Sequence, residues 1–115
     1  PGTVQSGAQC DDLVELADFL PTFLEIATAP QPMHRIHGQS FLPQLRGEDA
    51  SSREWVHVEY KNERQIRTKD WTYTDEGTLT KVNEFGQPEN DPEEQNGQSV
   101  VRDEMKKIFA SIDGR

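Results

Sequence analysis

The sequence predicts an α+β fold in which an antiparallel sheet of about four strands packs against a C-terminal helix, preceded by an N-terminal helix and a long connector. Three observations predict it. Apolar side chains recur at helical spacing over residues 18–28 and again over residues 99–113, and the segment between them holds four short runs rich in β-branched and aromatic residues. The short links between these runs favour antiparallel neighbours.

The N-terminal helix is expected to start at Asp18, whose carboxylate can accept hydrogen bonds from backbone N–H groups of the first turn. Pro21 falls in that turn, where its missing N–H costs little. Pro30 ends the helix, and a second short apolar run covers residues 41–45. Residues 13–16 fit either an extended segment or an early helical turn. The expected apolar face of the helix consists of Leu20, Phe23, Leu24 and Ala27.

The first strand is predicted by the alternation at residues 55–60. Val56, Val58 and Tyr60 lie on one side of it. The other, polar side carries Trp55, His57 and Glu59, so we expect His57 to be exposed. The three following strands are predicted at residues 65–68, 71–74 and 78–82, with hairpin-turn residues at 75–77.

The remainder of the chain is predicted to be a loop followed by a helix. Residues 83–97 are polar, acidic and poor in apolar side chains, which predicts a long surface loop. Ser99 is the expected cap of the last helix. The stripe that should cover one face of the sheet is Val101, Met105, Ile108 and Ile112, with Phe109 beside it.

The composition excludes several classes of function. With 12 basic and 21 acidic residues the net charge is -9, which argues against nucleic acid and against anionic lipid as partners and is typical of a soluble surface. No run approaches the roughly 18 apolar residues of a membrane helix, and no signal peptide is visible, so localisation cannot be read. Cys10 is the single cysteine, which excludes an intrachain disulfide. The hydrophobic share of 32% and a start at Pro1 rather than Met favour a piece of a larger fold.

Two motifs in the first half of the chain occur in a fixed order. They are DFLPTFLE at residues 18–25 and GQSFLPQLRG at residues 38–47. Together they resemble the late part of the sulfatase family, in which a D-x-x-P-T-x-L-E helix precedes a G-x-S-L-L-P-x-L-x-G connector. The first motif alone is less specific, since related phosphatase- and mutase-like enzymes carry similar helices.

The second half of the chain continues the resemblance. EYKNERQIRTKDWTY at residues 59–73 is similar to the E-Y-x-x-x-R-x-x-R-T-x-x-W/Y-x-Y pattern of the sulfatase C-terminal subdomain, and DPEEQN at residues 91–96 is similar to its D-P-x-E-x-x-N signature. Two positions depart from the pattern. Thr72 replaces a basic residue, and residues 79–82 replace L-Y-D-L.

The resemblance implies a parent protein that hydrolyses sulfate esters. In that family a formylglycine made from the Cys or Ser of a C-x-[PS]-x-R motif attacks sulfur, and Ca²⁺ held by Asp and Asn oxygens polarises the sulfate. Those groups belong to the N-terminal catalytic domain, upstream of this chain. Residues 1–47 would be the last helix and connector of that domain, and residues 48–115 the C-terminal sheet subdomain. The fragment itself would hold no catalytic, cofactor-binding or metal-binding residue and would be inactive alone, whereas the parent would bind calcium and would be exported or periplasmic.

Four side chains are candidates for the rim of the substrate cleft, because this subdomain borders the active-site mouth in the family. They are Arg64, Arg67, Lys69 and His37. The alternative for the three basic residues is a salt-bridged strand surface.

Other candidate sites are weaker. Cys10 lacks the neighbours of the formylglycine motif and is expected to be an ordinary thiol. His34 and His37 are three apart, but Pro32 and Gly38 argue against a helix there, and no third metal ligand is nearby. The acidic residues 91–94 lack the alternating ligands of a calcium loop.

A competing interpretation is a self-standing α+β protein-interaction domain, and a small metal- or ligand-binding enzyme is a third. One observation separates the first two interpretations. An excised piece should leave the apolar face of the helix at residues 18–28 exposed and prone to self-association, whereas a free-standing domain should cover it.

Overall fold

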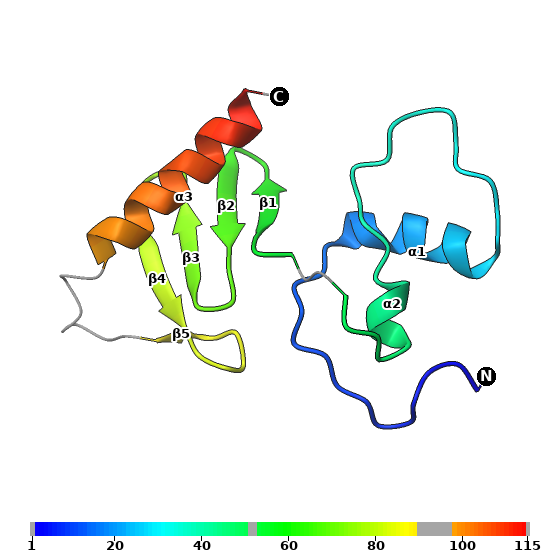
Figure 1. Cartoon of the computed structure of the whole chain (residues 1–115). Helices are drawn as coiled ribbons and strands as arrows, with labels where there is room; N and C mark the ends of the chain where they lie inside the picture. Colours follow the sequence, from blue (N-terminus) through cyan, green and yellow to red (C-terminus); the bar gives the residue numbers. More distant parts are fainter. Residues whose placement is uncertain (1, 51–52, 90–97, 115) are drawn as a thin grey trace. The chain divides into compact units, whose positions relative to one another are not determined.

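The computed structural model describes residues 2–50, 53–89 and 98–114 (Figure 1). The chain divides into two compact units, Pro1–Arg53 and Glu54–Arg115. Together they have the predicted α+β composition, with an N-terminal helix, a connector, an antiparallel sheet and a C-terminal helix. No helix of the described ranges is both long and apolar enough to span a membrane.

The first unit is built from short helices and a long connector. A 3-10 turn η1 (Leu16–Asp18) leads into helix α1 (Phe19–Ile26), and the short helix α2 (Leu42–Leu45) follows the connector. Residues 13–15 before this turn are irregular, so an extended strand is not formed there.

Helix α1 ends at Ile26, two residues before the predicted end. Thr28 takes a left-handed conformation with φ of 51°. In that conformation its N–H donates to the carbonyl of Glu25 at 3.1 Å, and the N–H of Ala29 donates to the carbonyl of Leu24 at 2.9 Å. This pair of bonds is a Schellman motif, which satisfies the last helical carbonyls.

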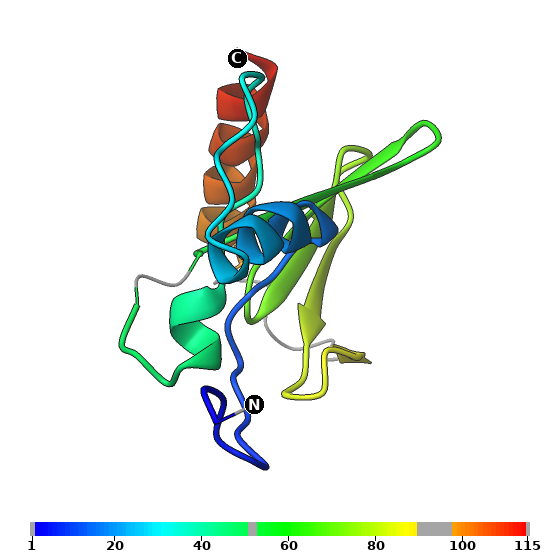
Figure 2. The ribbon, with the colours of Figure 1, turned by 90° about the vertical axis from the view of Figure 1, so that its right-hand side faces the viewer.

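The second unit is a five-stranded antiparallel meander in the order β1-β2-β3-β4-β5. Its elements are β1 (Val56–Tyr60), β2 (Glu63–Arg67), β3 (Trp71–Thr74), β4 (Leu79–Val82), β5 (Pro88–Glu89) and helix α3 (Gln98–Asp113). Helix α3 lies across one face of this sheet (Figure 1), and Figure 2 shows the β1–β2 hairpin projecting as a long ribbon. Four of the strands are the predicted ones.

The fifth strand lies within the segment that we predicted to be a loop. The Asn83 side chain accepts hydrogen bonds from the backbone N–H groups of Phe85 at 3.0 Å and Gln87 at 2.8 Å. This turn brings Pro88–Glu89 beside β4, where Pro88 pairs with Val82. Strand propensity could not indicate it, because proline and glutamate are poor strand formers. Residues 90–97, including DPEEQN, lie outside the described residues.

The core of the second unit lies between the sheet and α3. Its buried members are Ile66, Tyr73, Met105 and Phe109, and the partly buried ones around them are Trp55, Trp71, Leu79, Val101, Ile108 and Ile112. The predicted stripe of α3 therefore covers the sheet as expected. The helix begins at Gln98, so Ser99 lies in the first turn rather than before it.

The orientation of β1 corrects one prediction. His57 pairs in register with Ile66, whose side chain is fully buried, so both face α3. The His57 ring lies 6.3 Å from the ring of Phe109 in an edge-to-face arrangement. Val58 and Tyr60 on the opposite face are 49% and 67% exposed. Alternation identifies the two faces of a strand but not which one a helix covers. Here α3 covers the face of His57, and on the opposite face Val56 is buried whereas Val58 and Tyr60 are exposed.

Candidate functional site: the Asp18 network and the basic rim

Asp18 is the centre of a buried polar network in the first unit. It is 2% exposed, and one carboxylate oxygen accepts hydrogen bonds from the backbone N–H of Gln39 at 2.7 Å and from the Arg53 guanidinium at 2.6 Å. The other oxygen accepts the N–H of Glu15 at 2.8 Å. Arg53 also pairs with the Glu15 carboxylate at 2.7 Å. Three donors from separate segments thus converge on one carboxylate.

This arrangement corrects the predicted role of Asp18. Asp18 does occupy the N-cap position of α1, but among the described residues its side chain makes no capping hydrogen bond to that helix. The carboxylate instead caps the preceding η1 turn through the N–H of Glu15 and holds the connector and Arg53. A charged donor such as a guanidinium makes a stronger bond than a neutral backbone N–H, which favours this orientation.

Thr22 makes a second link between α1 and the connector. Its hydroxyl donates to the Asp18 carbonyl at 2.7 Å and accepts the N–H of Phe41 at 3.0 Å, and Thr22 is 1% exposed. Gly38 completes the contact, because a Cβ there would lie 1.9 Å from the carbonyl oxygen of Ala17. The Ser40 hydroxyl accepts the N–H of Leu42 at 3.2 Å, at the start of α2. Four positions of the two motifs, Asp18, Thr22, Gly38 and Ser40, therefore serve one local structure, which we call the Asp18 network.

The network is unsuited to hold calcium. A Ca²⁺ ligand must offer a carboxylate oxygen to the ion, whereas both oxygens of Asp18 already accept N–H bonds and one faces a guanidinium. Within the described ranges no group of three His, Cys, Asp or Glu side chains could hold a metal ion. The acidic residues 91–94 lie outside those ranges.

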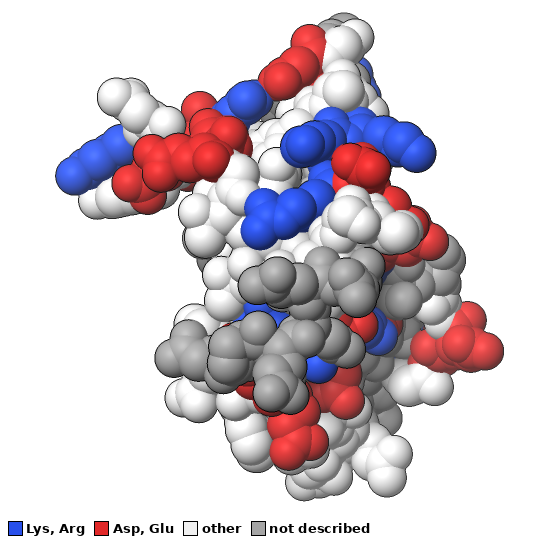
Figure 3. Space-filling view, turned by 90° about the vertical axis from the view of Figure 1, so that its left-hand side faces the viewer, with Lys and Arg blue, Asp and Glu red and all other residues white. Residues whose placement is uncertain are grey.

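The predicted rim residues of the second unit lie on different parts of the sheet. Arg64 shares a face with Ile66, toward α3, and its guanidinium carbon lies 5.2 Å from the centre of the Phe109 ring. Arg67 has the opposite parity and therefore points to the other face, where it donates to the Gly86 carbonyl at 3.4 Å. Lys69 follows in the β2–β3 link. The face drawn in Figure 3 carries both basic and acidic side chains, and several of them lie next to one another.

Arg64 forms ion pairs with two acidic side chains, Asp75 and Asp113. Its Nη1 lies 2.5 Å from Asp113 and its Nε 3.5 Å from Asp75. The hydrogen bond from Arg64 lowers the pKa of Asp113 below its usual range, and the same bond raises the pKa of Arg64. These two ion pairs are of the kind that the salt-bridged alternative for Arg64 implies.

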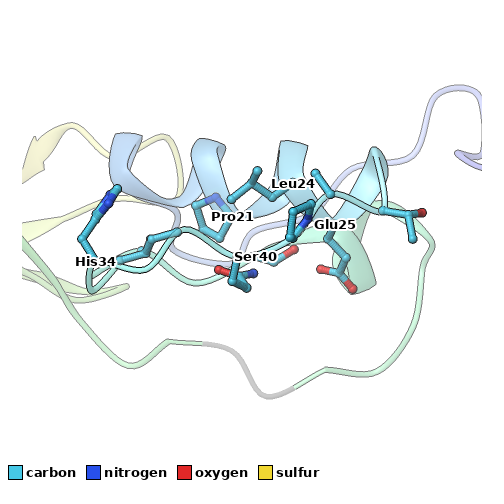
Figure 4. A pocket seen from close by; sticks show the side chains of 11 residues that line it. Pro21, Leu24, Glu25, His34 and Ser40 are labelled. Carbon is cyan, nitrogen blue, oxygen red and sulfur yellow. The ribbon is translucent and has the colours of Figure 1, made fainter.

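The two histidines of the connector are both exposed and lie in irregular backbone, as Pro32 and Gly38 predicted. His34 lines a shallow groove between α1 and the connector, in which Pro21, Leu24, Glu25 and Ser40 also lie (Figure 4). Cys10 is an exposed free thiol.

Sequence reasoning missed Arg53. The residue follows a polar break and belongs to no motif, yet it supplies the cation for Asp18. One signal could have indicated an arginine partner, because a buried carboxylate such as that of Asp18 needs a charged partner. The sequence alone could not choose among Arg35, Arg46 and Arg53.

The α+β fold and the Asp18 network agree with the expectation that the chain is the C-terminal part of a sulfatase, and the comparison with protein families tests that expectation. The family described as "N-sulphoglucosamine sulphohydrolase, C-terminal" matches residues 1–114, and the chain belongs to this family. The resemblance to sulfatases drawn from the motifs is thereby confirmed.

Two sulfatases illustrate the similarity. The chain is 32% identical over 83 residues to an ulvan-active sulfatase of Formosa agariphila, a match that covers 64% of this chain and 16% of that protein. A solved structure from Bacteroides thetaiotaomicron, assigned as a sulfatase, superposes with a TM-score of 0.57 at 22% identity, over 84% of this chain and 24% of that one. The second likeness shows a shared fold. In both cases the chain spans a minor part of the longer protein.

Proposed function

We propose that this chain is the C-terminal segment of a sulfuric ester hydrolase, that it supports the catalytic domain and shapes one wall of the substrate cleft, and that it is inactive alone. The observation that carries the proposal is the family match over residues 1–114. The Asp18 network supports it, because the side chains of Asp18 and Thr22 are bonded to backbone groups and to Arg53 rather than presented to a substrate.

In the proposed parent, residues 1–47 belong to the catalytic domain and residues 48–115 form the sheet subdomain. The bond from Arg53 to Asp18 lies within the first compact unit and would fix the end of that unit to its helix. The formylglycine and the calcium ion would be supplied by the preceding part of the polypeptide. This chain would then position the connector and the sheet beside them.

The rim residues have unequal roles in this proposal. Arg64 is held by Asp75 and Asp113 and would stabilise the subdomain. Arg67, Lys69 and His37 are the proposed contacts for an anionic substrate. The self-standing interaction domain has less support, because the apolar face of α1 is exposed, as expected of an excised piece.

An activity assay tests the proposal. The isolated chain and its parent protein are each incubated with an aryl sulfate, with and without Ca²⁺. We expect calcium-dependent turnover by the parent and none above background by the chain. Turnover by the chain would contradict its inactivity, and a parent without sulfatase activity would contradict the assigned class. A parent variant lacking the formylglycine-forming residue is the control for background hydrolysis.

A further inference from the structure

The two edges of the sheet in the second unit are built differently. At one edge β5 has two residues, one of which is Pro88, and a very short strand with a proline is a common way to keep an edge from pairing with another chain. At the other edge β1 has five residues, Val56–Tyr60, with no proline and with Glu59 as its one charged side chain. The β1–β2 hairpin also projects as a long ribbon (Figure 2). The β1 edge is therefore the one suited to strand pairing.

The backbone bonds of the sheet show which residues of β1 face that edge. The carbonyl of Arg64 accepts the N–H of Asp75 at 3.0 Å, so Arg64 bonds toward β3. Because the bonding direction alternates along a strand, the next residue of β2, Gln65, bonds toward its register partner Val58 in β1. The two residues on either side of Val58 then point their N–H and C=O groups away from β2, toward the outer edge.

Strand β1 can pair with a copy of itself over its whole length in one register. In an antiparallel pair centred on Val58, the two copies of Val58 lie opposite one another, Glu59 lies opposite His57, and Tyr60 lies opposite Val56. The residues that point to the outer edge then meet each other and can exchange their backbone bonds. A shift of two residues in either direction shortens the pairing, and one of these shifts places Glu59 opposite Glu59, which is destabilising.

We propose that the β1 edge binds a second copy of this protein, so that two copies of β1 pair antiparallel about Val58 and join the two sheets. Charge favours this occupant, since Glu59 meets His57 rather than another carboxylate. Apolar contacts favour it as well. Val58 and Tyr60 are 49% and 67% exposed, and they would be covered by Val58 and Val56 of the other copy.

Helix α3 leaves room for this contact. The helix lies over β2, where Ile66 packs with Met105 and Phe109. In the joined sheet the two copies of β2 would be three strand spacings apart, which is about 14 Å. Packed helices approach one another to about 8–10 Å, so the two copies of α3 would not collide. An interface made mainly of one strand pair is small, and we therefore expect a reversible dimer whose fraction depends on concentration.

Disulfide trapping in the parent protein tests the proposal. In a Cys10→Ser background, Val58→Cys places two thiols opposite one another at a Cα separation of about 4.5 Å, which a disulfide can bridge. Tyr60→Cys is the matched control, because it lies on the same face and is more exposed, yet its counterpart would be about 14 Å away along the strand. Under mild oxidation we expect Val58→Cys to form covalent dimer at least about tenfold faster than Tyr60→Cys. The Cys10→Ser parent alone gives the background.

A backbone substitution provides a second measurement. The N–H of Glu59 points to the outer edge, so Glu59→Pro removes a donor to the second copy without removing one to β2. We expect the Glu59→Pro parent to sediment as a monomer at concentrations where the Glu59→Gln parent is a dimer, with unchanged circular dichroism.

Four outcomes would overturn the proposal. The first is equal cross-linking of Val58→Cys and Tyr60→Cys, and the second is a parent that stays monomeric at every concentration. The third is cross-linking of Val58→Cys in the isolated chain but not in the parent, which would show that another part of the parent covers the β1 edge. The fourth is a folded Glu59→Pro parent that dimerises as tightly as Glu59→Gln, which would place the dimer contact elsewhere. The aryl sulfate assay bears on none of these outcomes, so the proposed function and the dimer contact can fail independently.

Discussion

Thr28 closes the C-terminal turn of α1 in a conformation that glycine normally supplies. Its φ of 51° lies in the left-handed region, where a β-branched side chain is strained. The two bonds of the Schellman motif nevertheless require this conformation, because they join residues 28 and 29 back to the helix. The strain at Thr28 is therefore a local cost of ending the helix there.

Replacing Thr28 by glycine should stabilise the first unit. Removing the Cβ relieves a left-handed strain of about 1–2 kcal/mol, and the greater freedom of glycine in the unfolded chain offsets part of it. We expect the free energy of unfolding to rise by about 0.5–1 kcal/mol, measured by urea denaturation. Thr28→Ala keeps a Cβ and is the matched control. A Thr28→Gly variant no more stable than Thr28→Ala would refute the strain.

Among the glycines that the structure describes, Gly38 is the least tolerant of a side chain. A Cβ would lie 1.9 Å from the Ala17 carbonyl oxygen, and both groups are backbone or fixed to it. We expect Gly38→Ala to displace the connector and weaken the bonds to Asp18 and Thr22, with a loss of at least about 3 kcal/mol in urea denaturation.

Gly47→Asn is the control for Gly38. Gly47 has a positive φ of 71° and no atom near its Cβ position, and asparagine tolerates that conformation. Its effect should stay within about 0.5 kcal/mol. Equal stability of the Gly38→Ala and Gly47→Asn variants would show that the connector does not pack on η1 as described.

At the scale of the elements, Arg64 joins β2 to the end of α3. Its bond to Asp113 crosses from the sheet to the helix, and the same guanidinium lies over the ring of Phe109. The bond keeps the pKa of Asp113 below its usual range. Because the folded pKa is lower than the unfolded one, the bond stabilises the fold at neutral pH, and this contribution is lost as the pH falls through the lowered pKa.

Carboxyl titration by NMR checks this bond. The pKa of Asp113 should lie below the ordinary aspartate value of about 3.9 and should return toward it in an Arg64→Gln variant. Asp75→Asn removes the other partner of Arg64 and should leave the pKa of Asp113 low. If Arg64→Gln does not change the titration of Asp113, then the bond is absent in solution.

Local patterns predicted most of the sheet unit. Strand β3 has the predicted bounds and the stripe of α3 faces the sheet, because aromatic, β-branched and helical spacings there agree with the tertiary contacts. Strand β5 was missed because a two-residue edge strand depends on the Asn83 turn, not on its own propensity. The exposure of His57 was predicted wrongly because the covered face of β1 is set by where α3 lies, which alternation does not encode.

At the scale of the whole molecule, the motifs predicted the sulfatase family but not how their residues act. Asp18 looked like a helix cap and is the acceptor for two other segments, since a distant arginine decides its orientation. The rim residues looked like one basic cluster. Arg64 and Arg67 point to opposite faces of the sheet, and sequence proximity does not reveal that Arg64 is paired with Asp113 at the far end of the chain.

The hydrogen bonds accepted by Asp18 and Thr22 come from the main chain of Gln39 and Phe41, not from their side chains. Every amino acid except proline carries that N–H. During divergence, substitutions at positions 39 and 41 can therefore alter the outward chemistry of the connector while both bonds persist. Asp18 and Thr22 bond through their side chains, and Gly38 has no room for a side chain, so these three positions cannot change in the same way. The connector can therefore change its exposed side chains while its hydrogen bonds to α1 stay the same.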